Sequence, residues 1–181
     1  AIFGSEHWLV VVGVLTIMLG MASWIALRPV RKKRPGVYAK ALLAISIAGV
    51  GTLLFVTQWV LTIEPWYAPK FVIPLAGMIF SNAMNAVSLA AERFEAELSR
   101  GADYRAARGT SLDAALIPIT NSFFAVGLVA LPGMMTGQIL SGVSPLIAAQ
   151  YQMMVMCMVF GASGIAATVY LLALSRQVTD G

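Results

Sequence analysis

The amino-acid sequence predicts an all-α integral membrane protein with about five transmembrane helices. Of its 181 residues, 59% are hydrophobic and only 11% are charged, and its mean hydropathy is +0.83. A soluble domain of this length carries about twice that charged fraction. The charged residues also stand at the ends of apolar runs, several of which reach the roughly 20 residues that a helix needs to cross a bilayer. We therefore expect a single transmembrane domain over residues 1–181.

Charged or proline-containing segments separate the expected spans. The spans cover residues 8–27, 39–63, 71–91, 114–131 and 145–175. Basic residues concentrate in the loop 28–38 and again in the loop 92–113, and the positive-inside rule places such loops in the cytoplasm. This topology puts residue 1 outside and the C-terminus in the cytoplasm.

Two connections are expected on the outer side. Residues 64–70 contain two prolines together with Trp66 and Tyr67, which is typical of a tight turn at the level of the lipid headgroups. Residues 114–175 carry no charge and are too many for one span. Glycines and prolines divide them, and we expect the connection 132–144 to be a short external helix or a re-entrant loop.

Amide and hydroxyl side chains inside the third and fourth spans mark a candidate translocation path. Such groups are costly in hydrocarbon unless they are paired, so they should face other helices or a wet cavity. A segment with proline, glycine and methionine follows the fourth span and offers soft or neutral ligands. Hydrogen bonding between helices explains the polar stripe as well as a substrate path does, and both interpretations stay open. The residues of the candidate path are Asn82, Asn85, Asn121, Ser122, Pro132, Gly133, Met134, Met135 and Gln138.

Methionine is frequent, with ten residues in the chain. Thioethers suit soft cations such as Cu(I), but no histidine or carboxylate accompanies the methionines after the fourth span, so the sequence does not identify a metal site. Four methionines in the last span point all round a helix, which favours flexible core packing. These are Met153, Met154, Met156 and Met158.

Several chemistries lack the residues they require. The chain has no GxxxxGK[ST] motif, so ATP hydrolysis of the P-loop kind is excluded. Gly161 to Gly164 resembles the serine motif of intramembrane proteases, but no histidine base follows Ser163. No carboxylate lies at the centre of a span, and the single Cys157 suits a buried apolar position. We expect no enzyme activity, no cofactor and no nucleic-acid binding. A transport role would need energy from another chain.

The polar segment 92–113 is the most informative part of the sequence. It joins two spans that a short turn could have connected. Arg93 and Arg100 can pair with Glu97 along one helix, and Gly101 ends that helix before a second one begins. We interpret the segment as a rigid surface for a soluble partner. The alternative is an amphipathic helix that rests on anionic membrane lipid.

The same segment carries a resemblance to known proteins. Glu95-Ala96-Glu97, followed by Gly101-Ala102, resembles the EAA-type coupling motif of ABC transporter permeases, although Ile117-Pro118 stands further downstream than in the importers. The resemblance implies that the loop docks on a cytoplasmic ABC ATPase subunit. The residues assigned to coupling are Glu95, Ala96, Glu97, Leu98, Gly101, Ala102 and Arg105.

The flanking segments are similar to one family in particular. The stretch that begins Ile73-Pro-Leu-Ala-Gly-Met, the stretch Leu131-Pro-Gly-Met-Met-Thr-Gly and Tyr151-Gln resemble the Fet/YbbM-type iron-export permeases (UPF0014), to which plant aluminium-tolerance permeases are related. The resemblance implies export of iron across the bacterial inner membrane by a homodimer with two ATPase subunits. Family members usually have two further spans ahead of the first one, and we expect this chain to lack them.

The leading hypothesis is thus the permease subunit of an ABC transporter that exports metal, most simply iron, across the plasma membrane. One alternative is a permease of the same kind for a nucleotide sugar. Another is a membrane scaffold that binds a cytoplasmic partner through the loop 92–113 without transport. A passive metal channel is disfavoured because no span contains an acidic residue that could form a ring.

Overall fold

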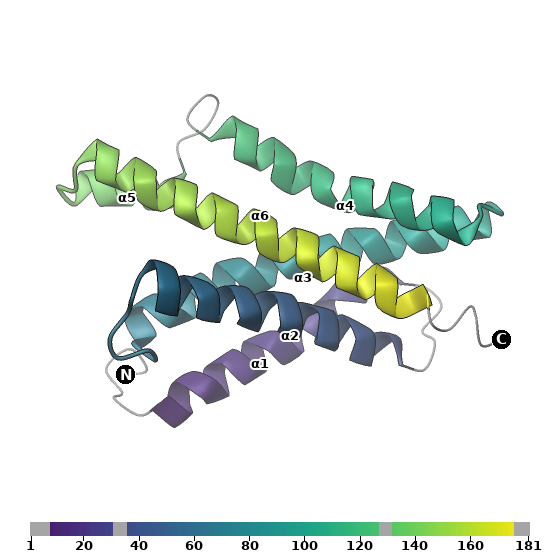
Figure 1. Ribbon diagram of the computed structural model, residues 1–181, viewed down its shortest axis with the longest axis horizontal. Helices are drawn as coiled ribbons and strands as arrows, with labels where there is room; N and C mark the ends of the chain where they lie inside the picture. The colour runs from purple at the N-terminus through teal and green to yellow at the C-terminus, as the bar shows by residue number, and fades with distance from the viewer. Residues whose placement is uncertain (1–7, 31–35, 127–131, 176–181) are drawn as a thin grey trace.

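The computed structural model describes residues 8–30, 36–126 and 132–175 and is helical throughout, with no strand in these ranges (Figure 1). Only α-helices and closed β-barrels can cross a bilayer without leaving backbone groups unpaired. The predicted all-α membrane fold is confirmed. Its helices are α1 (Trp8–Ala26), α2 (Val37–Phe55) with a π-helical continuation η2 (Val56–Val60), α3 (Pro69–Ser99), α4 (Tyr104–Ala125), α5 (Gly133–Leu140) and α6 (Pro145–Ser175).

Helix α3 lies at the centre of the bundle. It contacts α1, α2, α4 and α6, while α6 in turn contacts α2, α4 and α5. Alanines cover much of its buried surface and allow neighbouring helices to approach closely. The buried alanines of α3 are Ala76, Ala83, Ala86, Ala90 and Ala91.

Four helices in the described ranges are long and apolar enough to cross a membrane. They are Trp8–Ala26, Val37–Val60, Pro69–Ser99 and Pro145–Leu174. The predicted span 114–131 corresponds to the apolar half of α4, and its residues 127–131 lie outside the described part of the chain. Helix α4 begins already at Tyr104 and carries arginine and aspartate in its first half, which lowers its hydropathy. It nevertheless packs against α3 and α6 within the bundle.

Helix α3 runs through the predicted boundary between the third span, 71–91, and the loop 92–113. Helix α3 does not end near residue 91 but continues without a break to Ser99. Residues 92–99 consist largely of glutamate, arginine, alanine and leucine, which are strong helix formers. A helix can therefore leave the apolar layer without ending. At about 1.5 Å per residue, the 31 residues of α3 reach about 46 Å, well beyond roughly 30 Å of hydrocarbon.

The connection after α4 contains a short helix, which was one of the two predicted forms. Helix α5 ends at Leu140, and Gly142, whose φ of 89° lies in the left-handed region, reverses the chain after it. The Val143 N–H donates to the Gln138 carbonyl at 3.0 Å and the Gly142 N–H to the Ile139 carbonyl at 3.0 Å. This pair of bonds closes the helix and turns the chain into α6. The turn predicted at 64–70 is also present, between η2 and α3.

One end of the bundle collects the basic segments. The first residues of α2 and α4 and the last residues of α3 and α6 lie together at the right of Figure 1, while α5 lies at the opposite end. The two loops that the sequence assigns to the cytoplasm, 28–38 and 92–113, thus share one end, as far as the structure describes them. The fold is compatible with that topology, although its orientation in a membrane stays a prediction.

The contact of α2 with α3 yields a stability prediction. A Cβ added at Gly49 would lie 2.5 Å from Cε1 of Phe80, which is buried, whereas a Cβ at Gly51 would meet nothing within 4 Å. We expect Gly49→Ala to destabilise the fold by about 1–3 kcal/mol through overpacking. Gly51→Ala, which gains the same helix propensity, should leave stability unchanged or slightly higher. Unfolding in mixed detergent micelles measures both, and equal stabilities would contradict the packing described here.

Candidate functional site

Two adjoining cavities lie between α3, α4 and α6. The first has a volume of about 220 Å³ and the second, which reaches α5, about 310 Å³. Asn82, Ile119 and Ser122 line both, so the two lie side by side. We call the two together the polar cavity. The side chains in it that can bind a ligand are Met78, Asn82, Asn85, Ser122, Met134, Gln152, Met156 and Ser163.

Helical spacing brings the α3 residues of the polar cavity to one face. Met78, Asn82 and Asn85 follow one another at i, i+4 and i+7. The Asn82 amide nitrogen donates to the Met78 carbonyl at 2.8 Å, so the carboxamide oxygen is the end of Asn82 with lone pairs to offer. On α4, the Ser122 hydroxyl donates to the Pro118 carbonyl at 2.9 Å. Both donors are engaged within their own helices, which makes the cavity wall rich in acceptors.

Helix α6 contributes two buried polar groups that lack a partner. Gln152 is 4% exposed and Ser163 is 1% exposed. In the part of the chain that the structure describes, the Gln152 Oε1 and the Ser163 Oγ have no hydrogen-bond partner. A buried group in this state costs about 1–3 kcal/mol, and most such groups in folded proteins are satisfied by protein or ordered water. Their presence in a cavity wall points to a bound polar ligand or water.

Five of the nine predicted path residues line the polar cavity. Asn82, Asn85, Ser122, Pro132 and Met134 are brought together.

The other four do not line the polar cavity. Asn121 is exposed on a different face of α4, because successive helical residues are rotated by about 100°. Gly133, Met135 and Gln138 belong to α5, and only Met134 of that helix reaches the cavity. The proposed ligand segment after α4 thus contributes one thioether instead of a complete set.

Sequence reasoning missed Gln152 and assigned Ser163 to helix packing. The sequence marks Gln152 only through the family-like pair Tyr151-Gln, and Ser163 only through Gly161 to Gly164, so neither is predicted to line the path. A carboxamide in the middle of a span is nevertheless expensive in hydrocarbon. Gln152 and Ser163 are eleven residues apart, about three helical turns, which places them on the same side of α6. That cost was the available signal.

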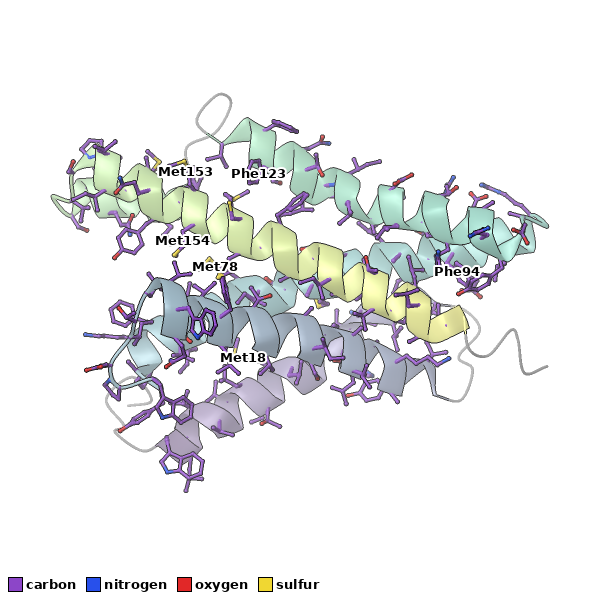
Figure 2. The ribbon with its side chains drawn as sticks, viewed as in Figure 1. Met18, Met78, Phe94, Phe123, Met153 and Met154 are labelled. Atoms are coloured by element: carbon purple, nitrogen blue, oxygen red, sulfur yellow. The ribbon has the colours of Figure 1, made fainter. Side chains whose placement is uncertain are left out.

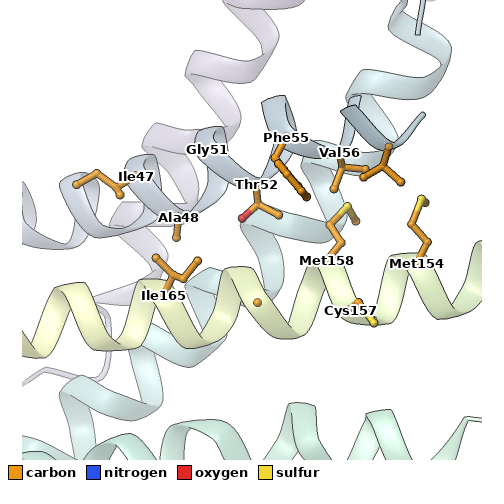
Figure 3. Close-up of a pocket in the computed structure, with 12 residues that line it drawn as sticks. Ile47, Ala48, Gly51, Thr52, Phe55, Val56, Met154, Cys157, Met158 and Ile165 are labelled. Carbon is orange, nitrogen blue, oxygen red and sulfur yellow. The ribbon is translucent and has the colours of Figure 1, made fainter. Parts of the chain in front are cut away.

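A further cavity has a different character. It is an apolar groove of about 500 Å³ between α2 and α6, and Met154, Cys157 and Met158 line it (Figure 3). Met153 is instead 59% exposed and lies on the opposite edge of the α6 ribbon from Met154 (Figure 2). The methionines of α6 therefore diverge, as the sequence indicated, and only Met156 reaches the polar cavity.

The tip of the α3–α4 hairpin contains the residues assigned to coupling. Glu97 Oε1 accepts from Arg93 Nη2 at 2.8 Å and from Arg100 Nη1 at 3.3 Å. Gly101, with φ 83°, allows the chain to reverse, and the Ala102 N–H donates to the Glu97 carbonyl at 3.1 Å. Asp103 then caps α4 by accepting from the Arg105 N–H at 3.2 Å. The tip is a short, fully hydrogen-bonded turn between two long helices.

The seven coupling residues do not form one surface. Leu98, Gly101 and Arg105 are exposed, while Glu95 is half-buried and lines, with Leu98, a cavity of about 280 Å³ next to Tyr170 of α6. Glu97 points away from Glu95, because residues two positions apart on a helix face nearly opposite sides. Ala96 and Ala102 are half-buried. The exposed part of the tip is thus smaller than the sequence motif.

Aromatic contacts join the tip to the rest of the bundle. The ring of Phe94 meets the ring of Tyr104 edge to face at 5.3 Å. The Tyr104 hydroxyl donates to the Leu171 carbonyl of α6 at 3.0 Å. A displacement of the tip must therefore act on α3, α4 and α6 together. These are the three helices around the polar cavity.

The described residues contain no group of three or more His, Cys, Asp or Glu side chains that could hold a metal ion. A ligand in the polar cavity would be held by uncharged donors.

The chain matches one protein family over nearly its whole length. The family described as "Uncharacterised protein family (UPF0014)" covers residues 1–179. The chain belongs to this family. The family suggested by the sequence motifs is confirmed, and no solved structure matches the chain.

The relatives are longer than this chain. It is 33% identical over 173 residues to the UPF0014 membrane protein slr1647 of Synechocystis, which covers 87% of this chain and 67% of that protein. It is 38% identical over 152 residues to the "Probable iron export permease protein FetB" of Escherichia coli, covering 74% and 58%. It is 32% identical over 179 residues to the Protein ALUMINUM SENSITIVE 3 of Arabidopsis thaliana, covering 90% and 63%. The chain spans about three fifths to two thirds of their lengths.

The polar cavity gives a direct test of water access. In a Cys157→Ser background, Ser163→Cys places a thiol in the cavity wall, and Ser23→Cys places one at an equally buried position whose hydroxyl is bonded to the Leu19 carbonyl. A small water-soluble methanethiosulfonate should modify Ser163→Cys at least severalfold faster than Ser23→Cys, because only the former borders a space that admits water. Equal rates would contradict a wet cavity.

Proposed function

We propose that this chain is the membrane permease of an ATP-driven exporter of metal ions, with iron as the first candidate. The observation that carries the proposal is the α3–α4 hairpin. Its two helices line the polar cavity in the bilayer and meet again at the charged tip. A soluble motor that moves the tip would change the shape of the cavity. The name of the E. coli relative, an iron export permease, supports the choice of cargo.

The energy for transport comes from a partner in this proposal. The chain has no P-loop motif, so a separate cytoplasmic ABC ATPase binds and hydrolyses ATP. It docks on the exposed part of the tip around Leu98, Gly101 and Arg105. The tip and the basic segments lie in the cytoplasm, in accord with the positive-inside rule. Two permease chains and two ATPase subunits make the working unit in the plasma membrane.

Uncharged ligands suit an exporter of this kind. A carboxylate cage would hold a metal ion tightly, whereas thioether and carboxamide donors bind it weakly enough for release. Closure of the ATPase pair would rock α3 and α4 against α6 and expose the polar cavity alternately to the two sides. The cavity needs no covalent chemistry for this role.

Charge reversal at the tip tests the docking. Glu97→Arg removes two ion pairs, each worth about 0.3–0.5 kcal/mol at a helix surface, so the fold should persist. The variant places a further positive charge between Arg93 and Arg100. It should abolish co-purification of an ABC-type ATPase from native membranes. Glu64→Arg, the same reversal at the opposite end of the bundle, is the matched control and should leave co-purification unchanged.

The assay separates the hypotheses. ATP hydrolysis by the co-purified complex is measured with Fe(II) and with UDP-glucose, and stimulation by Fe(II) is the expected result. Stimulation by UDP-glucose alone would replace metal by a nucleotide sugar. A partner that binds through the tip regardless of nucleotide and hydrolyses nothing would indicate a scaffold. Full ATPase binding by Glu97→Arg would refute docking at the tip.

A further inference from the structure

The end of the polar cavity next to α5 contains an unusual combination of side chains. Three thioethers reach it from three different helices: Met78 from α3, Met134 from α5 and Met156 from α6. Two carboxamides, Asn82 and Gln152, line the same space. Residues so far apart in the sequence meet here because α3 and α5 both pack against α6.

Core packing does not account for this arrangement. Methionine is flexible and usually fills gaps in a core, yet these three border a space of about 310 Å³. Met134 is 36% exposed, and Met78 and Met156 are half-buried. Gln152 supplies an independent sign of a ligand. It is 96% buried and lines the cavity, and its Oε1 has no hydrogen-bond partner among the described residues.

The donor set selects a class of ligand. Hard cations such as Mg²⁺ and Ca²⁺ need carboxylate or several other oxygen ligands. Thioether sulfur is a soft ligand and selects soft ions such as Cu(I). The thiol Cys157 belongs to the apolar groove instead of this cavity. A monovalent ion also suits a site of uncharged donors better than a divalent one, because less charge is left without compensation.

We propose that the α5 end of the polar cavity is a soft-metal site, in which the sulfur atoms of Met78, Met134 and Met156 and the carboxamide oxygens of Asn82 and Gln152 bind a monovalent ion of the Cu(I) or Ag(I) type. The site rests on the proposed permease function only for its role as a station on the transport path. It lies at the end of the cavity away from the hairpin tip, and it extends the proposed cargo from iron to soft monovalent ions.

Binding of Ag(I), a redox-stable probe for this class, tests the site. The full chain in detergent, with Cys157→Ser throughout, is titrated with Ag(I) in equilibrium dialysis. The triple variant Met78→Leu, Met134→Leu, Met156→Leu nearly conserves volume, so it should fold. Its Ag(I) affinity should fall by at least about tenfold, since even changes outside the ligand shell cost a metal site that much.

A matched control removes the same number of thioethers elsewhere. The variant Met18→Leu, Met153→Leu, Met154→Leu changes three methionines that lie outside the polar cavity, and it should bind Ag(I) as the parent does. Gln152→Ala should weaken binding without loss of helicity in circular dichroism. Undiminished affinity in the cavity triple variant, an equal loss in the control, or tighter binding of Fe(II) or Mg²⁺ than of Ag(I) would overturn the assignment.

The assay uses neither ATPase nor nucleotide, so its result is independent of the docking experiment. Failure of Ag(I) binding with intact ATPase coupling would remove the soft-metal site and leave the permease. If Ag(I) binds but no ATPase co-purifies, the soft-metal site is supported and the proposed ATP-driven transport is refuted.

Discussion

The structure depends above all on the close packing of α3 against four other helices. An apolar bilayer gives no hydrophobic drive for helices to associate, so contact between small residues supplies much of it. The alanines of α3 and of α6, such as Ala83 and Ala166, are fully buried at these contacts. The face of α3 that carries Asn82 and Asn85 is not covered by small residues in this way. The polar cavity exists because that face meets α4 and α6 without close packing.

A second constraint is that polar groups in hydrocarbon must find partners. Most hydroxyls of the bundle meet it locally: Ser23, Thr57 and Ser111 each donate to a carbonyl one turn earlier in the same helix. The Gln152 Oε1 is an acceptor and cannot donate to a backbone carbonyl. The Ser163 hydroxyl could donate to one, but it has no hydrogen-bond partner among the described residues. Ser122 donates to a carbonyl of its own helix and still lines the polar cavity. The unpaired atoms of Gln152 and Ser163 are therefore the stronger sign that the cavity holds a polar ligand or water.

The sequence was sufficient for the class of fold, the family and the position of the chain reversal, because composition, a specific motif and a glycine mark them directly. Charge marked where the third span is expected to leave the apolar layer, and the helix itself continues past that point to Ser99. The sequence identified Asn82 and Asn85, which are three residues apart on α3, and Ser122, which is a polar residue in the apolar half of α4. It did not assign Gln152 to the path, because the faces that α3, α4 and α6 turn toward one another are set by tertiary packing.

The central claim is that the hairpin tip and the polar cavity move as one unit. It is tested most directly by the reaction rate of a thiol at Asn85→Cys, in the Cys157→Ser background, in a complex with the proposed ABC ATPase. A non-hydrolysable ATP analogue should change this rate severalfold, because the proposed closure of the motor would displace α3 and α4 against α6. The same rate with and without the analogue, in a complex shown to bind it, would contradict mechanical coupling between tip and cavity.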